Sequence, residues 1–301
     1  MRAHLIGATV ALLVGPAIAL AQPRLTVSTK TPKPGDPILV TVAGVDARPE
    51  GTGGRAQLVF FPVRGGWQAV FAVPHEDPSG ELQVKIDGVG LKETLAIRAY
   101  QFPQEPVTVA PELAEPSSGK AKQIDADNSA IINAAKNSGP PLFRVPFRYP
   151  TGSVTSPFGA QRTFNGDIYK SRHLGMDVAA RLGAPVRAFA RGKVALVYDG
   201  FLVGGTVVVV HGAGIASVHF HLSDIAVAVG DEVDRGAVLG KVSLTGRTTG
   251  PHIHVGIWVS GGFVDPAVFA RLKLGSPSKS PFAARPLAPG HGGVARQRID
   301  P

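Results

Sequence analysis

The sequence predicts a mainly β protein with two domains and one short helix between them. Its 301 residues include 37 glycines and 26 prolines, and only 18% of the residues are charged. Such a composition is typical of loop-rich β structure. Short runs of Val, Ile and Thr, separated by Gly and Pro turns, occur in both halves of the chain. In the second half no helical period of useful length separates these runs, which favours antiparallel sheets over β-α-β units.

Residues 1–21 have the features of a secretory signal peptide. Arg2 gives the charged start, residues 5–20 form an apolar run, and Ala19-Leu20-Ala21 forms an A-x-A cleavage site. The run is shorter than the roughly 20 residues needed to span a bilayer. We therefore expect an exported chain in the periplasm or cell envelope, with no stable membrane span once the signal is removed. An uncleaved membrane anchor is the alternative.

Residues 22–112 predict an immunoglobulin-like β-sandwich, because seven short strands follow one another with turn residues between them. The chain has no cysteine, so this sandwich must be stabilised by packing alone. The expected strands are 25–30, 38–43, 57–61, 68–73, 81–86, 94–99 and 107–109.

Residues 113–141 predict a linker with a short amphipathic helix over 123–137, where isoleucines recur at helical intervals. The helix packs on one of the domains in this interpretation. It could instead cover the histidine site described below and inhibit it, with Asp125 or Asp127 as an extra ligand. Acidic residues on a short helix are usually solvated, which favours the first interpretation.

Residues 142–274 predict the second domain, an antiparallel β structure, and residues 275–301 a basic, disordered tail. Because the linker is rich in Pro and Ser, we expect each half of the chain to hold its own core. The strands expected in the second domain are 185–190, 193–198, 206–211, 215–221, 238–242 and 252–259.

A set of histidines gives the second domain its chemistry. Six of the nine histidines fall between residues 173 and 254, and four of them form the pairs His219/His221 and His252/His254. In a strand, residues i and i+2 share a face and lie about 6.6 Å apart. Neutral imidazoles with one carboxylate, Asp177, suit a catalytic zinc site with three protein ligands and one water. Strand geometry alone does not decide which member of the second pair binds the metal.

The order and spacing of these motifs resemble the lysostaphin/LytM-type zinc metalloendopeptidases, which cut peptidoglycan peptides. The resemblance runs from about residue 143 to 266 and includes Thr155-Ser156-Pro157-Phe158-Gly159. The motifs that carry it are His173-x(3)-Asp177, His221-Leu222-Ser223 and Gly250-Pro251-His252-Ile253-His254.

The resemblance implies a LytM-type peptidase domain with one zinc per chain. It makes His173, Asp177 and His254 the zinc ligands, and His221 and His252 catalytic residues that stay off the metal. Peptidoglycan peptides are the substrate that it implies.

One position departs from the family pattern. Two residues before His221 the family usually has tyrosine, and this chain has His219. By strand alternation His219 should share a face with His221. We therefore expect it to alter the groove or the choice of substrate without removing a ligand. His211, which starts a Gly-rich turn, is expected to be structural.

The sequence thus predicts a secreted zinc-dependent endopeptidase that hydrolyses peptide cross-links or stems of peptidoglycan. The net charge of +9 suits an anionic partner such as cell wall, and no nucleic-acid-binding signature is present. The alternative is a non-catalytic wall-binding regulator or activator of other hydrolases, which the complete histidine set disfavours. A signal peptide without a wall-anchoring motif favours a Gram-negative periplasm. The bond that is cut and the oligomeric state stay open.

Overall fold

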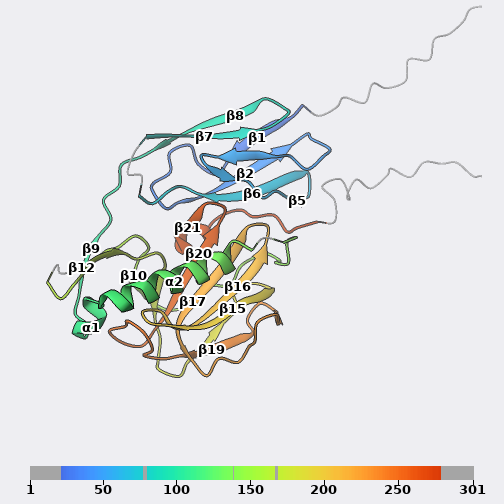
Figure 1. Cartoon of the computed structure of the whole chain (residues 1–301). Coiled ribbons are helices and arrows are strands. Elements are labelled where there is room, and N and C mark those ends of the chain that lie inside the picture. Colours follow the sequence, from blue (N-terminus) through green and yellow to red (C-terminus); the bar gives the residue numbers. More distant parts are fainter. Residues whose placement is uncertain (1–21, 77–79, 138, 167–168, 279–301) are drawn as a thin grey trace, which may run out of the picture.

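The computed structural model describes residues 22–76, 80–137, 139–166 and 169–278 (Figure 1). Almost all strand pairs are antiparallel, as the sequence predicted for a mainly β fold. Two four-stranded sheets form the N-terminal half, and a ten-stranded sheet dominates the second half. A small three-stranded sheet and the helix α2 complete the described part of the chain.

The N-terminal half consists of two sheets that bury a common apolar core. Ile38 and Phe71 of one sheet meet Val84 and Leu95 of the other, and all four side chains are buried. The immunoglobulin-like type of this two-sheet unit stays a prediction. The first sheet contains, in spatial order, β1 (Arg24–Val27), β2 (Pro37–Ala43), β6 (Gly66–Ala72) and β5 (Phe61–Val63). The second contains β4 (Ala56–Gln57), β3 (Gly51–Gly53), β7 (Gly80–Ile86) and β8 (Leu91–Ile97).

The last strand predicted for the sandwich belongs elsewhere. Instead of a sandwich strand at 107–109, β9 (Gln104–Val107) pairs in parallel with β11 (Gln161–Phe164), which pairs with β12 (Tyr169–Arg172). β9 is an edge strand of this three-stranded sheet. An edge position tolerates Pro106, which has no N–H to donate. The chain between the halves is therefore tied to the second half by a strand.

The second half is organised around one large sheet. Each of its six predicted strands overlaps a strand of the structure. The order of neighbours along the sheet is β10 (Val154–Ser156), β13 (Met176–Ala179), β20 (His252–Val259), β17 (Ile215–Ser223), β16 (Gly204–Gly212), β15 (Gly192–Gly200) and β18 (Glu232–Val233). The remaining elements are β14 (Pro185–Arg187), β19 (Val238–Val242), β21 (Gly262–Val264) and the short helix α3 (Pro266–Phe269).

The two halves also share one apolar cluster, in addition to the clusters that each half contains by itself. Val70 and Ala72 of β6 pack in one cluster with Ile257 and Val259 of β20. The backbone N–H of Ala72 also donates to the carbonyl of Ser260 at 2.9 Å. The physical reason is that β6 is buried along its whole length, so one face packs into the sandwich and the other into the second half. A strand that is buried on both faces needs partners on both sides.

Helix α2 (Ser118–Ala135) lies across the large sheet, where Figure 1 shows it in front of β16 and β17. It begins before the predicted residue 123, because Ser117 caps its N-terminus by accepting from the N–H of Lys120. Ile131 and Ala135 pack on valines and alanines of β16 and β17. A second short helix, α1 (Pro111–Ala114), precedes it.

Asp127 fixes α2 to the sheet. Its side chain is 2% exposed, and its two oxygens accept hydrogen bonds from the Tyr198 hydroxyl and the Phe201 N–H, both at 2.8 Å. The prediction that the acidic residues of this helix are solvated is therefore wrong for Asp127. The use of Asp127 as an extra metal ligand is also wrong, since the hairpin between β15 and β16 occupies its carboxylate.

Two predictions fall on the ends of the chain. The predicted signal peptide at 1–21 and residues 279–301 of the predicted tail lie outside the described residues. Residues 275–278 do contact the sandwich, where the Gly275 N–H donates to the Gln68 side chain at 2.8 Å. In the part of the chain that the structure describes, no helix is both long and apolar enough to cross a membrane.

The anchoring of α2 can be tested by Asp127→Ala. This change removes the charged acceptor of two partly buried donors, so we expect it to lower the free energy of unfolding by about 1–2 kcal/mol. Asp125→Ala on the exposed face of the same helix is the matched control, expected within about 0.5 kcal/mol of the parent. Denaturant unfolding measures both. Equal stabilities of the two variants would contradict the anchor.

Candidate metal centre

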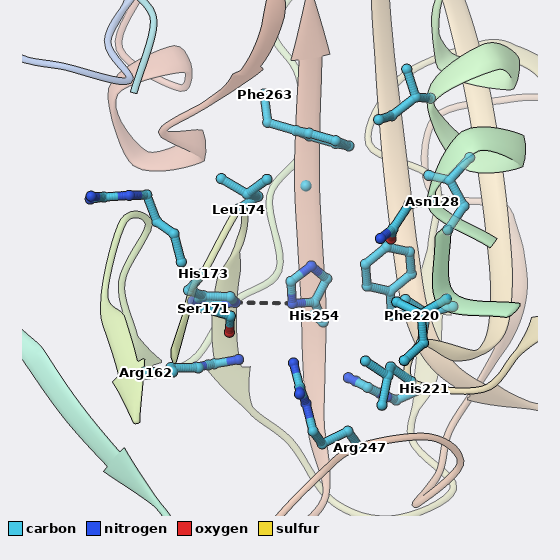
Figure 2. Close-up of a pocket in the computed structure, with 17 residues that line it drawn as sticks. Asn128, Arg162, Ser171, His173, Leu174, Phe220, His221, Arg247, His254 and Phe263 are labelled. Atoms are coloured by element: carbon cyan, nitrogen blue, oxygen red, sulfur yellow. Dashed lines mark hydrogen bonds between the residues drawn. The ribbon is translucent and has the colours of Figure 1, made fainter. Parts of the chain in front are cut away.

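The site lies where three neighbouring strands of the large sheet bring polar side chains together. β13 pairs with β20 so that Asp177 lies opposite His254, and β17 pairs with β20 so that Phe220 lies opposite His254. His173 precedes β13 in the chain, and His221 follows Phe220. Figure 2 shows His173 and His254 facing each other, with Phe220 and His221 on the far side of His254.

Three side chains form a compact group with metal-ligand chemistry. His173 Nε2 lies 3.1 Å from both Asp177 Oδ1 and His254 Nδ1, and these last two atoms are 2.8 Å apart. The side chains of His173, Asp177 and His254 are all buried. In a tetrahedral zinc site with bonds of about 2.0–2.1 Å, ligand atoms lie about 3.3 Å apart. The three atoms therefore fit one face of such a tetrahedron after a small outward movement.

The protonation states also suit a metal. Burial alone would raise the pKa of Asp177, but its close contacts with His173 and His254 outweigh it and hold that pKa well below its usual range. Burial lowers the pKa of His254 to about 4. At neutral pH the group therefore combines an ionised carboxylate with a neutral imidazole, the forms in which these side chains bind metals.

Contacts behind the group hold its rings in place. The Pro157 carbonyl lies 3.0 Å from His173 Nδ1 and can only accept, so Nδ1 carries the proton and Nε2 is left to face the group. The His254 ring stacks on Phe220 with centroids 4.6 Å apart. Gly175 leaves room for that ring, because a Cβ there would lie 2.5 Å from two of its atoms. These contacts fix the orientation of both imidazole rings, as is usual for histidines that bind a metal ion.

His221 and His252 lie beside the group with their rings 5.0 Å apart. His221 Nδ1 lies 2.8 Å from the Thr245 carbonyl, and His252 Nδ1 lies 2.8 Å from the Gly250 carbonyl. Both Nδ1 atoms must therefore be the donors, which leaves both Nε2 atoms able to accept a proton. Burial lowers the pKa of His221 to about 3, so it is neutral at pH 7. His252 Nε2 lies 3.6 Å from Asp177 Oδ1.

His219 does not share the groove with His221, so that prediction is wrong. The pairing of β16 with β17 shifts between Val207↔His219 and Gly205↔Leu222, three residues of β17 against two of β16. This bulge, in which His221 has a φ of 61°, breaks the alternation of side chains. His219 is fully buried, with its ring 4.6 Å from that of Phe189.

His219 belongs to a buried polar chain below the sheet. Ser217 Oγ lies 3.1 Å from His219 Nε2 and 2.9 Å from His211 Nε2. His211 Nδ1 in turn donates to the Arg191 carbonyl at 3.0 Å. His211 is therefore structural, as predicted, and His219 extends the same internal network.

A cavity of about 340 Å³ opens beside the metal-ligand group. Helix α2 supplies part of its wall. The sequence left open whether this helix packs on a domain or covers the site, because helical periodicity does not say against which surface a helix packs. Its lining combines apolar side chains with three arginines. They include Ile124, Ile131, Leu174, Phe220, Phe263, Arg162, Arg172 and Arg247.

Arg162 is a site residue outside the motifs that identified the others. Its Nη2 atom donates to Asp177 Oδ2 at 2.5 Å, so the other oxygen, Oδ1, is the one that faces the two histidines. In the sequence Arg162 shows no spacing relation to a metal ligand. Only the pairing of β11 beside β9 and β12 brings it to the site.

Comparison with known proteins agrees with this geometry. The sequence model of Peptidase family M23 matches residues 171–266. A crystal structure of a putative peptidase M23 from Pseudomonas aeruginosa is 30% identical, with a TM-score of 0.61, and the match covers 80% of this chain and 95% of that one. The chain belongs to peptidase family M23. The resemblance seen in the sequence motifs is thereby confirmed.

Two curated M23 relatives are longer proteins. DD-carboxypeptidase/endopeptidase Mpg of Neisseria meningitidis serogroup B is 36% identical over 135 residues, which are 44% of this chain and 31% of that protein. Peptidoglycan DD-endopeptidase ShyA of Vibrio cholerae is 35% identical over 142 residues, 46% of this chain and 33% of that protein. The match thus spans about a third of these relatives.

The buried histidines predict that stability falls in acid. Burial lowers the pKa of His211 to about 4 and that of His219 to about 3, against about 6.5 in an unfolded chain. Protonation therefore favours the unfolded chain. Their contribution to stability is full above pH 6.5 and is lost as the pH falls through about 6.5 towards 4 and below. The melting temperature of metal-free protein, measured from about pH 7.5 to about pH 4, should fall. His211→Gln should flatten the fall, and a melting temperature independent of pH would contradict the assignment.

Proposed function

We propose that this M23 chain is an exported, zinc-dependent endopeptidase that hydrolyses peptide cross-links or stems of peptidoglycan. The observation that carries the proposal is the set of three donor atoms from His173, Asp177 and His254, 2.8–3.1 Å apart, with two further histidines beside it. The complete set favours an enzyme over a non-catalytic regulator. Domain limits at 22–112, 113–141 and 142–274 remain part of the proposal.

In this proposal His173 Nε2, His254 Nδ1 and Asp177 Oδ1 hold one zinc ion. When bound, zinc lowers the pKa of a water towards neutrality and polarises the carbonyl of the scissile bond. Asp177 brings the negative charge that offsets part of the charge of the ion, and Arg162 keeps its second oxygen turned away. The ligand set leaves room for water and substrate, as catalytic sites require.

His221 and His252 act as the general acid–base residues. Each ring donates through Nδ1 to a backbone carbonyl, so its Nε2 is free to take a proton from the attacking water and to return it to the leaving amine. A protonated Nε2 also donates a hydrogen bond to the oxyanion that develops on the carbonyl. The rings lie close enough for both to reach one substrate atom from different sides.

The substrate proposal comes from the cavity and from the relatives. Peptide stems with free carboxylates complement a cavity whose lining includes Arg162, Arg172 and Arg247. The names of the relatives Mpg and ShyA describe DD-endopeptidases, and ShyA a peptidoglycan one. We infer the same substrate class here, and with it a periplasmic or cell-envelope location after export through residues 1–21.

The ligand assignment predicts one zinc per chain. His254→Ala removes one of three protein ligands, so we expect the zinc content of purified protein to fall from about one to well below one per chain. Elemental analysis of protein prepared without added zinc measures this. Full zinc content in the His254→Ala protein would overturn the assignment.

The two remaining histidines should separate chemistry from metal binding. His221→Ala and His252→Ala should keep their zinc and lose about 10²–10⁴-fold in hydrolysis, the usual range for general acid–base help. His211→Gln, in the buried chain away from the site, is the matched control and should stay near the parental rate. Loss of zinc from His252→Ala would mean that the roles in the second pair are reversed.

Digestion of purified sacculi tests the substrate. Mass spectrometry of the released muropeptides should show products cut in their peptide part, with intact glycan. The product masses identify the bond that is cut. Sacculi left unchanged by zinc-loaded protein would overturn the proposed substrate.

A further inference from the structure

The strand β9, which lies outside the residues that match the M23 family, brings a carboxylate to the edge of the metal centre. β9 pairs in parallel with β11 so that Glu105 lies opposite Arg162. Both side chains are partly buried, at 28% and 21% exposure. Glu105 is therefore fixed in place by a backbone ladder, and only the pairing of β9 with β11 brings it there.

One carboxylate oxygen of Glu105 accepts hydrogen bonds from two residues that themselves contact metal-ligand residues. Its Oε2 accepts from Arg162 Nε at 2.8 Å and from Ser156 Oγ at 2.7 Å. Arg162 continues to Asp177 Oδ2, and Ser156 Oγ lies 3.1 Å from His173 Nδ1. One intermediate residue thus separates Glu105 from Asp177, and another separates it from His173.

We propose that Glu105 is a positioning residue for the metal centre, acting through Arg162 and Ser156. The inference rests on the proposed zinc site. It assigns to β9, which precedes the residues that match the family, a part in holding the metal.

The first effect is on the direction of Arg162. A guanidinium held by Glu105 through Nε presents Nη2 to Asp177, which turns Asp177 Oδ1 towards the two histidines. Without Glu105 the arginine keeps its charge and loses its fixed direction. Loss of the Glu105 charge makes the group of charges around the ligands more positive by one unit. This opposes the binding of a cation, in a partly buried place where screening by salt is weak.

The second effect is on the proton of Ser156. A hydroxyl has one proton, and Ser156 donates it to Glu105. Its oxygen can then only accept from Arg162 and from His173 Nδ1. Glu105 thereby supports the tautomer in which His173 Nε2 is free for the metal. Without it, Ser156 is free to donate to Nδ1 and so to oppose the Pro157 carbonyl, which holds the proton on that nitrogen.

The test measures zinc affinity of the full chain by competition with a chromogenic chelator. Glu105→Gln keeps the shape and removes the charge, and loss of such an outer contact typically weakens metal binding by about 10–100-fold. Glu232→Gln is the matched control, because Glu232 pairs with Arg191 at 2.8 Å away from the site. We expect the control to bind zinc like the parent.

Two further measurements separate positioning from a general structural role. The metal-free Glu105→Gln protein should melt within about 2 °C of the parent, a shift smaller than about 1 kcal/mol would cause. In an Arg162→Gln background, Glu105→Gln should cost less zinc affinity, because the effect through Arg162 is already lost and only the effect through Ser156 remains.

Three outcomes would overturn the inference. They are parental zinc affinity in Glu105→Gln, an equal loss with and without Arg162, and a large loss of metal-free stability. A parent that binds no zinc would instead overturn the proposed function itself. Binding by the parent with no effect of Glu105→Gln would overturn only the role of Glu105.

Discussion

The second half of this molecule depends on one buried carboxylate. Asp177 lies 5% exposed in the middle of a sheet, where an unpaired charge would be strongly destabilising. Its charge is compensated by the imidazoles of His173 and His254 at Oδ1 and by the guanidinium of Arg162 at Oδ2. The same arrangement leaves Oδ1, His173 Nε2 and His254 Nδ1 directed at one small space. The arrangement that compensates the charge of Asp177 is therefore also the one that can bind a metal. Since the chain has no cysteine, its ligand atoms are oxygen and nitrogen only.

The sequence was sufficient to predict the candidate metal ligands, because they belong to short motifs that can be recognised locally. The family resemblance carried by the H-x(3)-D and H-x-H motifs implied the grouping of His173, Asp177 and His254. In the structure the register of β13 and β20 sets Asp177 against His254. The prediction failed at His219, because one extra residue in β17 cancels the alternation from which a shared face was inferred. A bulge depends on the partner strand, and the partner strand is not visible in a local pattern.

Contacts between residues far apart in the sequence were not predicted, for a related reason. The burial of Asp127 depends on Tyr198 and Phe201, more than 70 positions along the chain, so its acidic character on a short helix suggested solvent exposure. β6 was correctly predicted as a strand over 68–73. Its burial on both faces was not predicted, and only the position of β20 shows that the second face packs on the peptidase half.

These contacts change what the N-terminal half does for the site. The shared core makes β6 part of the support for β20, the strand that carries His252 and His254. α2 gives a wall to the cavity beside the metal-ligand group, and β9 brings Glu105 to the residues that hold Asp177 and His173. The motifs of the M23 family supply the reacting groups. The preceding part of the chain supplies rigidity, one wall and a balancing charge, so the geometry of the site is a property of both halves together.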